Sequence, residues 1–292
     1  MRNLINDLFY FIWRLLSPFN FSLYLFSRKS KISRKKSLNG YLPQLDKISD
    51  IIKAELLTNQ SFITQVENAK TSTDDFGFSF DCLPYITPNT KKILLETALY
   101  DSFIISNVKN FLGIKPTLNT ISIYANVPRA NDQEVGSKMW HRDGLTFLTA
   151  DFMFSITEIS DRNGPFFYID PFDFGSNKVI KPKVNIGWKM GGRYSTEDLV
   201  EAGLDIQNIK KFVGPQGNFI LLNTGEAYHR GGYCESEIRI LGRFVYSSFG
   251  YSKGNLNKYG LTKNSNQEIL QKLSNTCYSI HEKVYRNIIS KL

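Results

Sequence analysis

The sequence predicts a mainly β fold, an antiparallel sandwich or jelly roll with helices before and after it. Its middle carries short apolar runs separated by turn residues, and no long helical pattern lies between these runs. Helical periodicity returns only in the flanking segments. Consecutive strands without alternating helices favour an antiparallel arrangement over a doubly wound parallel sheet.

Five segments have the length and composition expected of strands. They are TISIYANV (120–127), LTADFMFSITEI (148–159), PFFYI (165–169), NFILLN (218–223) and RILGRFVYSSF (239–249). A short helix is expected between them at STEDLVEAG (195–203). The β core therefore occupies about residues 117–250.

The flanking segments have the period of amphipathic helices. One helix is predicted over residues 45–56, where apolar residues recur every three or four positions. A second helix, capped by Asn89, should end near Gly113. An apolar stripe over residues 270–288 predicts a helix at the C-terminus.

Length and composition are those of a folded enzyme-sized domain. The chain has 292 residues, of which 42% are hydrophobic, enough for one large core. We expect a single domain over residues 38–292, preceded by an extension over residues 1–37. The three cysteines, Cys82, Cys234 and Cys277, are odd in number and widely spaced, which predicts neither a disulfide framework nor a zinc site and favours the cytoplasm.

The basic charge is concentrated in the extension. Of the formal net charge of +9, most comes from residues 1–37, where eight Lys and Arg residues face only Asp7. The rest of the chain is nearly neutral, so no nucleic-acid partner is expected. Asp7, Arg14 and Pro18 interrupt the apolar residues, and no uncharged stretch reaches the roughly 18–20 residues that a membrane span needs.

Two interpretations of the extension remain open. An apolar stretch followed by the basic run RKSKISRKK (28–36) suits peripheral contact with an anionic membrane surface. The same pattern also fits a helix that packs on the domain and is followed by a solvated linker. The oligomeric state has no signal in the sequence.

Two of the three histidines define a candidate metal site. In KMWHRDGL (138–145), His141 and Asp143 are one residue apart, so an extended strand would direct both side chains to the same face. His229 follows an apolar strand and a polar turn in LLNTGEAYHRGG (221–232). Two imidazoles and one carboxylate form the facial triad of non-haem Fe(II) oxygenases. The alternative is a surface ion pair between His141 and Asp143.

Two arginines could recognise a carboxylate next to this site. Arg239 lies ten residues after His229, at the start of a predicted strand. Its planar fork of donors matches a carboxylate, such as the distal one of 2-oxoglutarate. Arg243 shares the face of Arg239 by strand parity and competes for this role. The alternative is that both arginines face outward from an edge strand.

Four sequence blocks together resemble the phytanoyl-CoA dioxygenase family of 2-oxoglutarate oxygenases. The blocks, within about residues 117–250, are WHRDG (140–144), FSITEISDRNGPFFYI (154–169), GPQGNFILLNTGEAYHRGG (214–232) and the strand that begins at Arg239. The resemblance implies a double-stranded β-helix, a cupin-like jelly roll. It also implies that His141, Asp143 and His229 bind Fe(II) and that Arg239 binds 2-oxoglutarate.

The resemblance extends to further residues and to the reaction. Tyr124 and Thr224 could offer hydroxyl groups to 2-oxoglutarate, and Trp140 would either line the substrate pocket or simply pack. The turn at 163–165 is expected to be structural. Because halogenating relatives lack the carboxylate, Asp143 favours hydroxylation, with O2 and 2-oxoglutarate consumed and succinate and CO2 released.

The substrate is expected to be a small organic or lipid-like molecule. The segment IDPFDFGS (169–176) departs from the family pattern and leaves the substrate class open. Two other functions are compatible with the sequence. One is a non-catalytic metal-binding jelly roll recruited to membranes by its basic N-terminus, and the other is a cupin-like isomerase or hydrolase that uses another metal.

Overall fold

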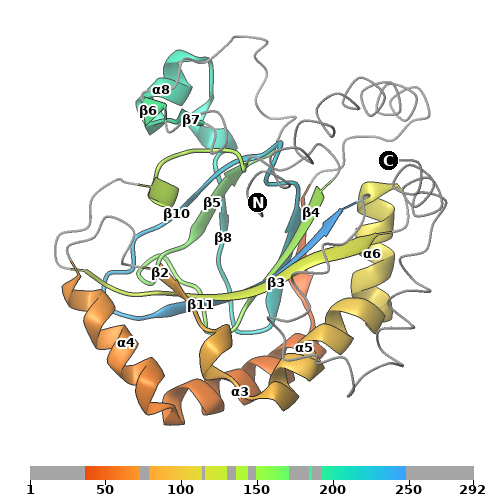
Figure 1. Cartoon of the computed structure of the whole chain (residues 1–292). Coiled ribbons are helices and arrows are strands. Elements are labelled where there is room, and N and C mark those ends of the chain that lie inside the picture. Colours follow the sequence, from red (N-terminus) through yellow and green to blue (C-terminus); the bar gives the residue numbers. More distant parts are fainter. Residues whose placement is uncertain are drawn as a thin grey trace, which may run out of the picture. The chain divides into compact units, whose positions relative to one another are not determined.

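Two antiparallel β-sheets carry the helices and loops of the protein (Figure 1). The computed structural model describes residues 37–72, 79–113, 116–129, 136–143, 149–170, 184–185 and 192–247. Apart from Ser37, the N-terminal extension lies outside these residues, as does the helix expected at 270–288. None of the described helices is long and apolar enough to cross a membrane.

The larger sheet has six strands. Their order is β1 (Leu38–Tyr41), β9 (Asn218–Leu222), β4 (Thr149–Ser155), β11 (Arg239–Ser247), β3 (Thr117–Asn126) and β2 (Ser79–Asp81), and all neighbours are antiparallel. The smaller sheet consists of β10 (Tyr228–Gly231), β5 (Phe166–Ile169) and β8 (Lys210–Phe212). A two-stranded ribbon of β6 (Val184–Asn185) and β7 (Gly192–Arg193) stands apart from both.

The chain crosses repeatedly between the two sheets. It passes from β3 in the larger sheet to residues 140–141, which extend the smaller sheet through a bridge between His141 and His229. It then runs through β4, β5, β8, β9, β10 and β11, so that strands distant in sequence pair with one another. This order is that of a double-stranded β-helix and confirms the predicted jelly roll.

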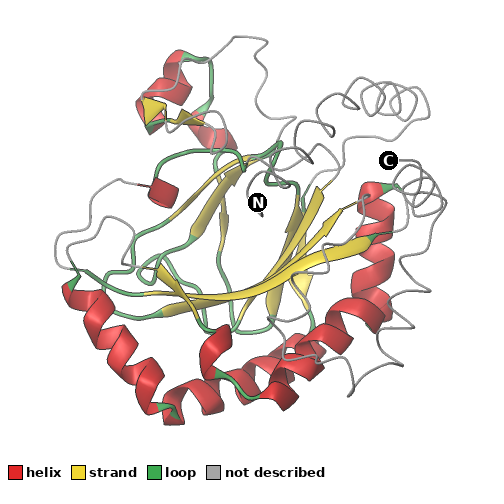
Figure 2. Cartoon of the chain, viewed as in Figure 1, coloured by secondary structure: helices red, strands yellow, loops and turns green. Residues whose placement is uncertain are grey.

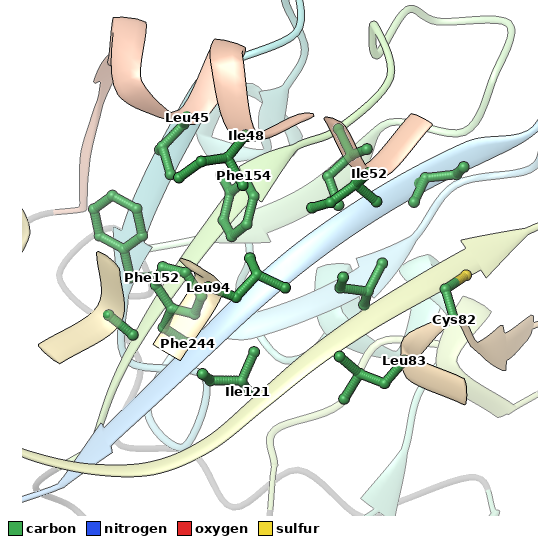
Figure 3. Close-up of a cluster of buried hydrophobic side chains, with 14 of the residues drawn as sticks. Leu45, Ile48, Ile52, Cys82, Leu83, Leu94, Ile121, Phe152, Phe154 and Phe244 are labelled. Atoms are coloured by element: carbon green, nitrogen blue, oxygen red, sulfur yellow. The ribbon is translucent and has the colours of Figure 1, made fainter. Parts of the chain in front are cut away.

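Four helices cover one face of the larger sheet (Figures 1 and 2). They are α3 (Pro43–Thr58), α4 (Gln60–Thr71), α5 (Pro88–Tyr100) and α6 (Ser102–Leu112). The side chains of Phe152, Phe154 and Phe244 point from the sheet toward Leu45 and Leu94 of the helices (Figure 3). Each fully buried side chain of this size contributes about 1.5–3 kcal/mol to folding.

The opposite face of the larger sheet points toward the smaller sheet. Because side chains alternate along a strand, Asp151 and Met153 of β4 and Leu241 and Arg243 of β11 belong to this second face. Met153 and Leu241 join an apolar cluster with residues of the smaller sheet. The charged side chains between the sheets form the candidate site described below.

All five predicted strands exist; β4, β5 and β9 are shorter than the predicted runs, whereas β3 begins three residues earlier, at Thr117. The helix predicted after residue 88 is two helices, because Asp101 ends α5 and caps α6 by accepting a hydrogen bond from Ile104 N. The cap of α5 is Thr87 rather than Asn89, since the Thr87 hydroxyl accepts from Thr90 N. The short helix α8 (Thr196–Glu201) forms where it was expected, with Ser195 in a capping box.

Candidate metal centre

His141 and His229 are brought together by backbone pairing. The amide of His141 donates to the carbonyl of His229 over 3.0 Å, and the reverse bond is 2.9 Å long. This bridge places the two imidazole rings with their centroids 4.3 Å apart. Both residues are buried, in the space between the two sheets.

The hydrogen bonds of the two imidazoles fix which nitrogen faces the site. His141 Nδ1 lies 2.8 Å from the carbonyl of Met139, and His229 Nδ1 lies 3.0 Å from the carbonyl of Ala227. A carbonyl only accepts, so each Nδ1 carries the proton and each Nε2 keeps its lone pair. Burial, His229 and Arg193 lower the pKa of His141 to about 3, which keeps this ring neutral at physiological pH.

Asp143 completes the group with one of its two oxygens. Its Oδ1 lies 3.8 Å from His141 Nε2 and 3.6 Å from His229 Nε2. Its backbone amide donates to the carbonyl of Thr224 over 2.9 Å, which holds the residue in place. Burial raises the pKa of Asp143, but His229, Arg243 and His141 outweigh this effect and hold the pKa well below its usual range.

These three residues fit a divalent transition metal. One donor atom from each lies within 4.8 Å of the others. Two neutral imidazole nitrogens and one carboxylate oxygen are the donor set of the 2-His-1-carboxylate facial triad. Three protein ligands leave coordination positions open, as in a catalytic rather than a structural metal site.

Arg243 links Asp143 to a second, fully buried carboxylate. Its Nη2 donates to Asp143 Oδ2 over 2.8 Å, and its Nε donates to Asp151 Oδ1 over 2.6 Å. Thr224 donates its hydroxyl to Asp151 Oδ2 over 2.5 Å and lies 3.3 Å from Arg243 Nη2. Burial lowers the pKa of Arg243, but Asp151 and Asp143 raise it by more. The net pKa lies above the ordinary value of arginine, so the guanidinium stays charged.

Arg239 has different surroundings, although it lies on the same face of β11. Its Nη2 donates to Asn126 Oδ1 over 2.8 Å, and its Nη1 donates to the carbonyl of Gly164. The side chain is only 4% exposed, and burial lowers its pKa. Within the described part of the chain, its hydrogen-bond partners are neutral, and the nearby Lys138 is a second buried cation.

The turn at 163–165 connects the site to β5. Asn163 closes the turn, with Oδ1 accepting from Ser160 N over 2.6 Å and Nδ2 donating to the carbonyl of Glu158 over 2.6 Å. Gly164 has φ +84° and lies against Cys234 Sγ, so a side chain there would clash. The turn is structural, as expected, and it also supplies the carbonyl that Arg239 contacts.

The remaining predicted residues have clear positions. Tyr124 lies on β3, opposite Leu241, and 40% of it is exposed. Trp140 is fully buried, donates to Thr196 Oγ1 over 3.0 Å and packs in an apolar cluster with Tyr194. The assignment of Tyr124 and Thr224 to 2-oxoglutarate stays a prediction, and the Thr224 proton is already donated to Asp151.

Sequence reasoning missed four residues around the site: Asn126, Lys138, Asp151 and Arg193. Asp151 had a readable signal, because a carboxylate in the middle of an apolar strand must have a buried partner. Arg193 comes from β7, which belongs to neither of the two main sheets, and its charge reaches His141 and Asp143. Asn126 becomes recognisable only once β11 pairs with β3, which sets it opposite Arg239.

No protein-family model and no curated protein matches the sequence. Distantly similar solved structures include AviO1 from Streptomyces viridochromogenes Tue57, with 10% identity over 76% of this chain and 95% of that one and a TM-score of 0.47. The epimerase SnoN, in complex with Fe3+, alpha ketoglutarate and nogalamycin RO, has 12% identity over 81% of this chain and 89% of that one, with a TM-score of 0.47. HygX from Streptomyces hygroscopicus, with nickel and 2-oxoglutarate bound, has 15% identity over 78% of this chain and 87% of that one, with a TM-score of 0.45. A likeness this distant assigns no family.

Proposed function

We propose that this chain is an Fe(II)- and 2-oxoglutarate-dependent dioxygenase. One observation carries the proposal. The Nε2 atoms of His141 and His229 and the Oδ1 atom of Asp143 converge between the two sheets, with both Nδ1 protons already donated to carbonyl groups. Bound Fe(II) and 2-oxoglutarate would supply the oxidation of a C–H bond by O2.

The contacts of the two arginines favour Arg239 for the distal carboxylate of 2-oxoglutarate. Arg243 is already paired with Asp143 and Asp151. Arg239 is a buried cation with neutral hydrogen-bond partners in the described residues, and Lys138 adds positive charge nearby. A buried charge without a counter-charge is costly, so a carboxylate ligand would be most strongly stabilised there.

We further propose hydroxylation of a small organic or lipid-like substrate and a relationship to the phytanoyl-CoA dioxygenase family. The order of the four sequence blocks supports the family, and the carboxylate of Asp143 argues against halogenation. The chain's own part is to hold the ligands and exclude water. Trp140, Tyr194 and Tyr228 are buried and pack with Leu199 of α8 in an apolar cluster next to the strands that carry His141 and His229.

The test measures turnover of 2-oxoglutarate by the full chain. Purified protein supplied with Fe(II), ascorbate, O2 and 2-oxoglutarate should release succinate, slowly even without a primary substrate. His141→Ala and Asp143→Ala should abolish succinate release, whereas Arg162→Met, on the exposed surface, should leave it unchanged. Equal succinate release by wild type and both ligand variants would overturn the proposal.

A matched pair of variants separates the two arginines. Arg239→Met should raise the KM for 2-oxoglutarate by at least about 30-fold, because the loss of a buried charge pair costs roughly 2–5 kcal/mol. Arg239→Lys should recover only part of this loss, since an ammonium group lacks the planar fork. An unchanged KM in Arg239→Met would exclude Arg239 as the carboxylate partner.

A further inference from the structure

The two oxygens of Asp143 lie in different surroundings. Oδ1 faces the two Nε2 atoms, at 3.8 Å and 3.6 Å. Oδ2 accepts a hydrogen bond of 2.8 Å from Arg243 Nη2. The carboxylate is therefore presented to the metal position by one oxygen, while a guanidinium holds the other.

Arg243 is itself held in place by the buried residues Asp151 and Thr224. Asp151 is fully buried, and its Oδ1 accepts from Arg243 Nε over 2.6 Å. Its Oδ2 accepts from both the hydroxyl and the amide of Thr224, over 2.5 Å and 3.3 Å. The carbonyl of Thr224 in turn accepts from the amide of Asp143. Asp151 thus holds both residues that contact Asp143.

This geometry points to a positioning role: we infer that Arg243, anchored by Asp151, restricts Asp143 to monodentate ligation through Oδ1. The inference rests on the metal centre of the proposed function. A carboxylate free to turn could bind one ion through both oxygens and occupy a further coordination position. With Oδ2 held by Arg243, that position stays available to 2-oxoglutarate and O2.

The network also explains why an arginine occupies this position. A guanidinium offers several donors in a fixed plane, so one side chain bridges two carboxylates with defined directions. A lysine at the same position has a single charged atom at the end of a flexible stem. It would neutralise one carboxylate but could not fix the orientation of both.

The main test variant is Asp151→Asn combined with Arg243→Met. This double variant removes one negative and one positive charge, so the net charge near the metal is unchanged and the fully buried carboxylate of position 151 is not left without its guanidinium. Co(II) replaces Fe(II) as the probe, since its visible d–d absorption weakens as the coordination number rises. Affinity is measured by calorimetric titration of the full chain, and Arg162→Met is the matched surface control.

We expect wild type and Arg162→Met to bind Co(II) alike. The double variant should bind Co(II) about 10- to 100-fold more weakly, the usual effect of losing an outer-shell partner, with weaker d–d bands. A folded double variant with the affinity and spectrum of wild type would overturn the inference. Failure of wild type itself to bind Co(II) would instead remove the metal centre, and with it the proposed function.

Arg243→Lys keeps the inference testable if the double variant does not fold. It retains the positive charge beside Asp151 and therefore avoids an unpaired buried carboxylate. A lowered Co(II) affinity with altered d–d bands supports the positioning role, because charge alone is then insufficient. Wild-type affinity and spectrum in Arg243→Lys would show that the fork of donors has no such role.

Discussion

Replacing Gly242 with alanine should destabilise the protein through a single steric contact. Gly242 lies in the middle of β11 and pairs with Phe154 of β4. A Cβ atom at position 242 would lie 2.1 Å from Phe154 Cζ and 2.4 Å from Cε1. Ordinary contacts begin near 3.4 Å, so the ring would have to move by more than about 1 Å.

The surroundings of Phe154 determine the magnitude. The ring is fully buried, and its centroid lies 5.1 Å from that of Phe244, so it has little room to move. Overpacking of this kind typically costs about 1–3 kcal/mol. Replacing glycine in a strand recovers roughly 0.5–1 kcal/mol of chain entropy. Because the ring has little room to move, we take the upper half of the overpacking range, about 2–3 kcal/mol, and expect a net loss of about 1–2.5 kcal/mol in the free energy of unfolding.

Urea-induced unfolding of the full chain measures this loss, and Gly40→Ala is a matched control. Gly40 also faces a phenylalanine ring, but its Cβ would lie 3.1 Å from Phe219 Cε1, and it lies on the edge strand β1. This control should change the stability by less than about 0.5 kcal/mol. In the Gly242→Ala background, Phe154→Leu should cost less than it does alone, because leucine lacks the tip of the ring. The reasoning is refuted if Gly242→Ala is as stable as wild type, or if Phe154→Leu costs the same in both backgrounds.

Three further outcomes are expected. In the Co(II)-loaded wild type, 2-oxoglutarate at about 100 times its Kd should stabilise the fold by about 2.7 kcal/mol. At the same concentration, Arg239→Met, which binds at least about 30-fold more weakly, should gain less than about 0.9 kcal/mol; equal stabilisation in thermal unfolding would contradict this. Glu55→Gln should cost roughly 1 kcal/mol at pH 7, because the Glu55 carboxylate accepts bonds from Thr87 and Thr90 at the start of α5. Burial raises the pKa of Glu55, but these hydrogen bonds lower it by more, so the net pKa is below its ordinary value. The stability difference between wild type and Glu55→Gln should therefore shrink as the pH falls below about 4, and a difference that grew in acid would contradict this prediction. Asp101→Ala should cost about 1 kcal/mol by removing the cap of α6, and an unchanged urea midpoint would show that the cap has no effect.

Much of the fold could be predicted because its strands have a strong local pattern. In β11, alternating residues correctly placed Arg239 and Arg243 on one face. The break at Asp101 was missed because the apolar period of α5 continues into α6, and a cap residue inside such a pattern looks like an ordinary polar position. Helix α4 and the short strands have apolar patterns too weak or too brief to recognise.

The candidate site was predictable where short-range geometry decides it. His141 and Asp143 are one residue apart, and extended backbone directs both toward one point. The partners of Arg243 were not predictable, because Asp143 and Asp151 come from positions about 90 to 100 residues away in sequence. The pairing of β4 with β11 brings Asp151 to Arg243, and the hydrogen bond from the amide of Asp143 to the carbonyl of Thr224 holds Asp143 beside them.

The long sequence separation between the paired strands β1 and β9 has a consequence for synthesis on the ribosome. Among the described strands, β1 at residues 38–41 pairs with β9 at residues 218–222, some 180 residues later in the chain. At about 5–20 residues per second, that interval lasts roughly 10–40 s. Over that interval the nascent chain carries β1 without the strand that pairs with it in the folded sheet. The larger sheet therefore cannot be completed at its β1 edge until β9 has been made, which is a long-range pairing of the kind that slows folding.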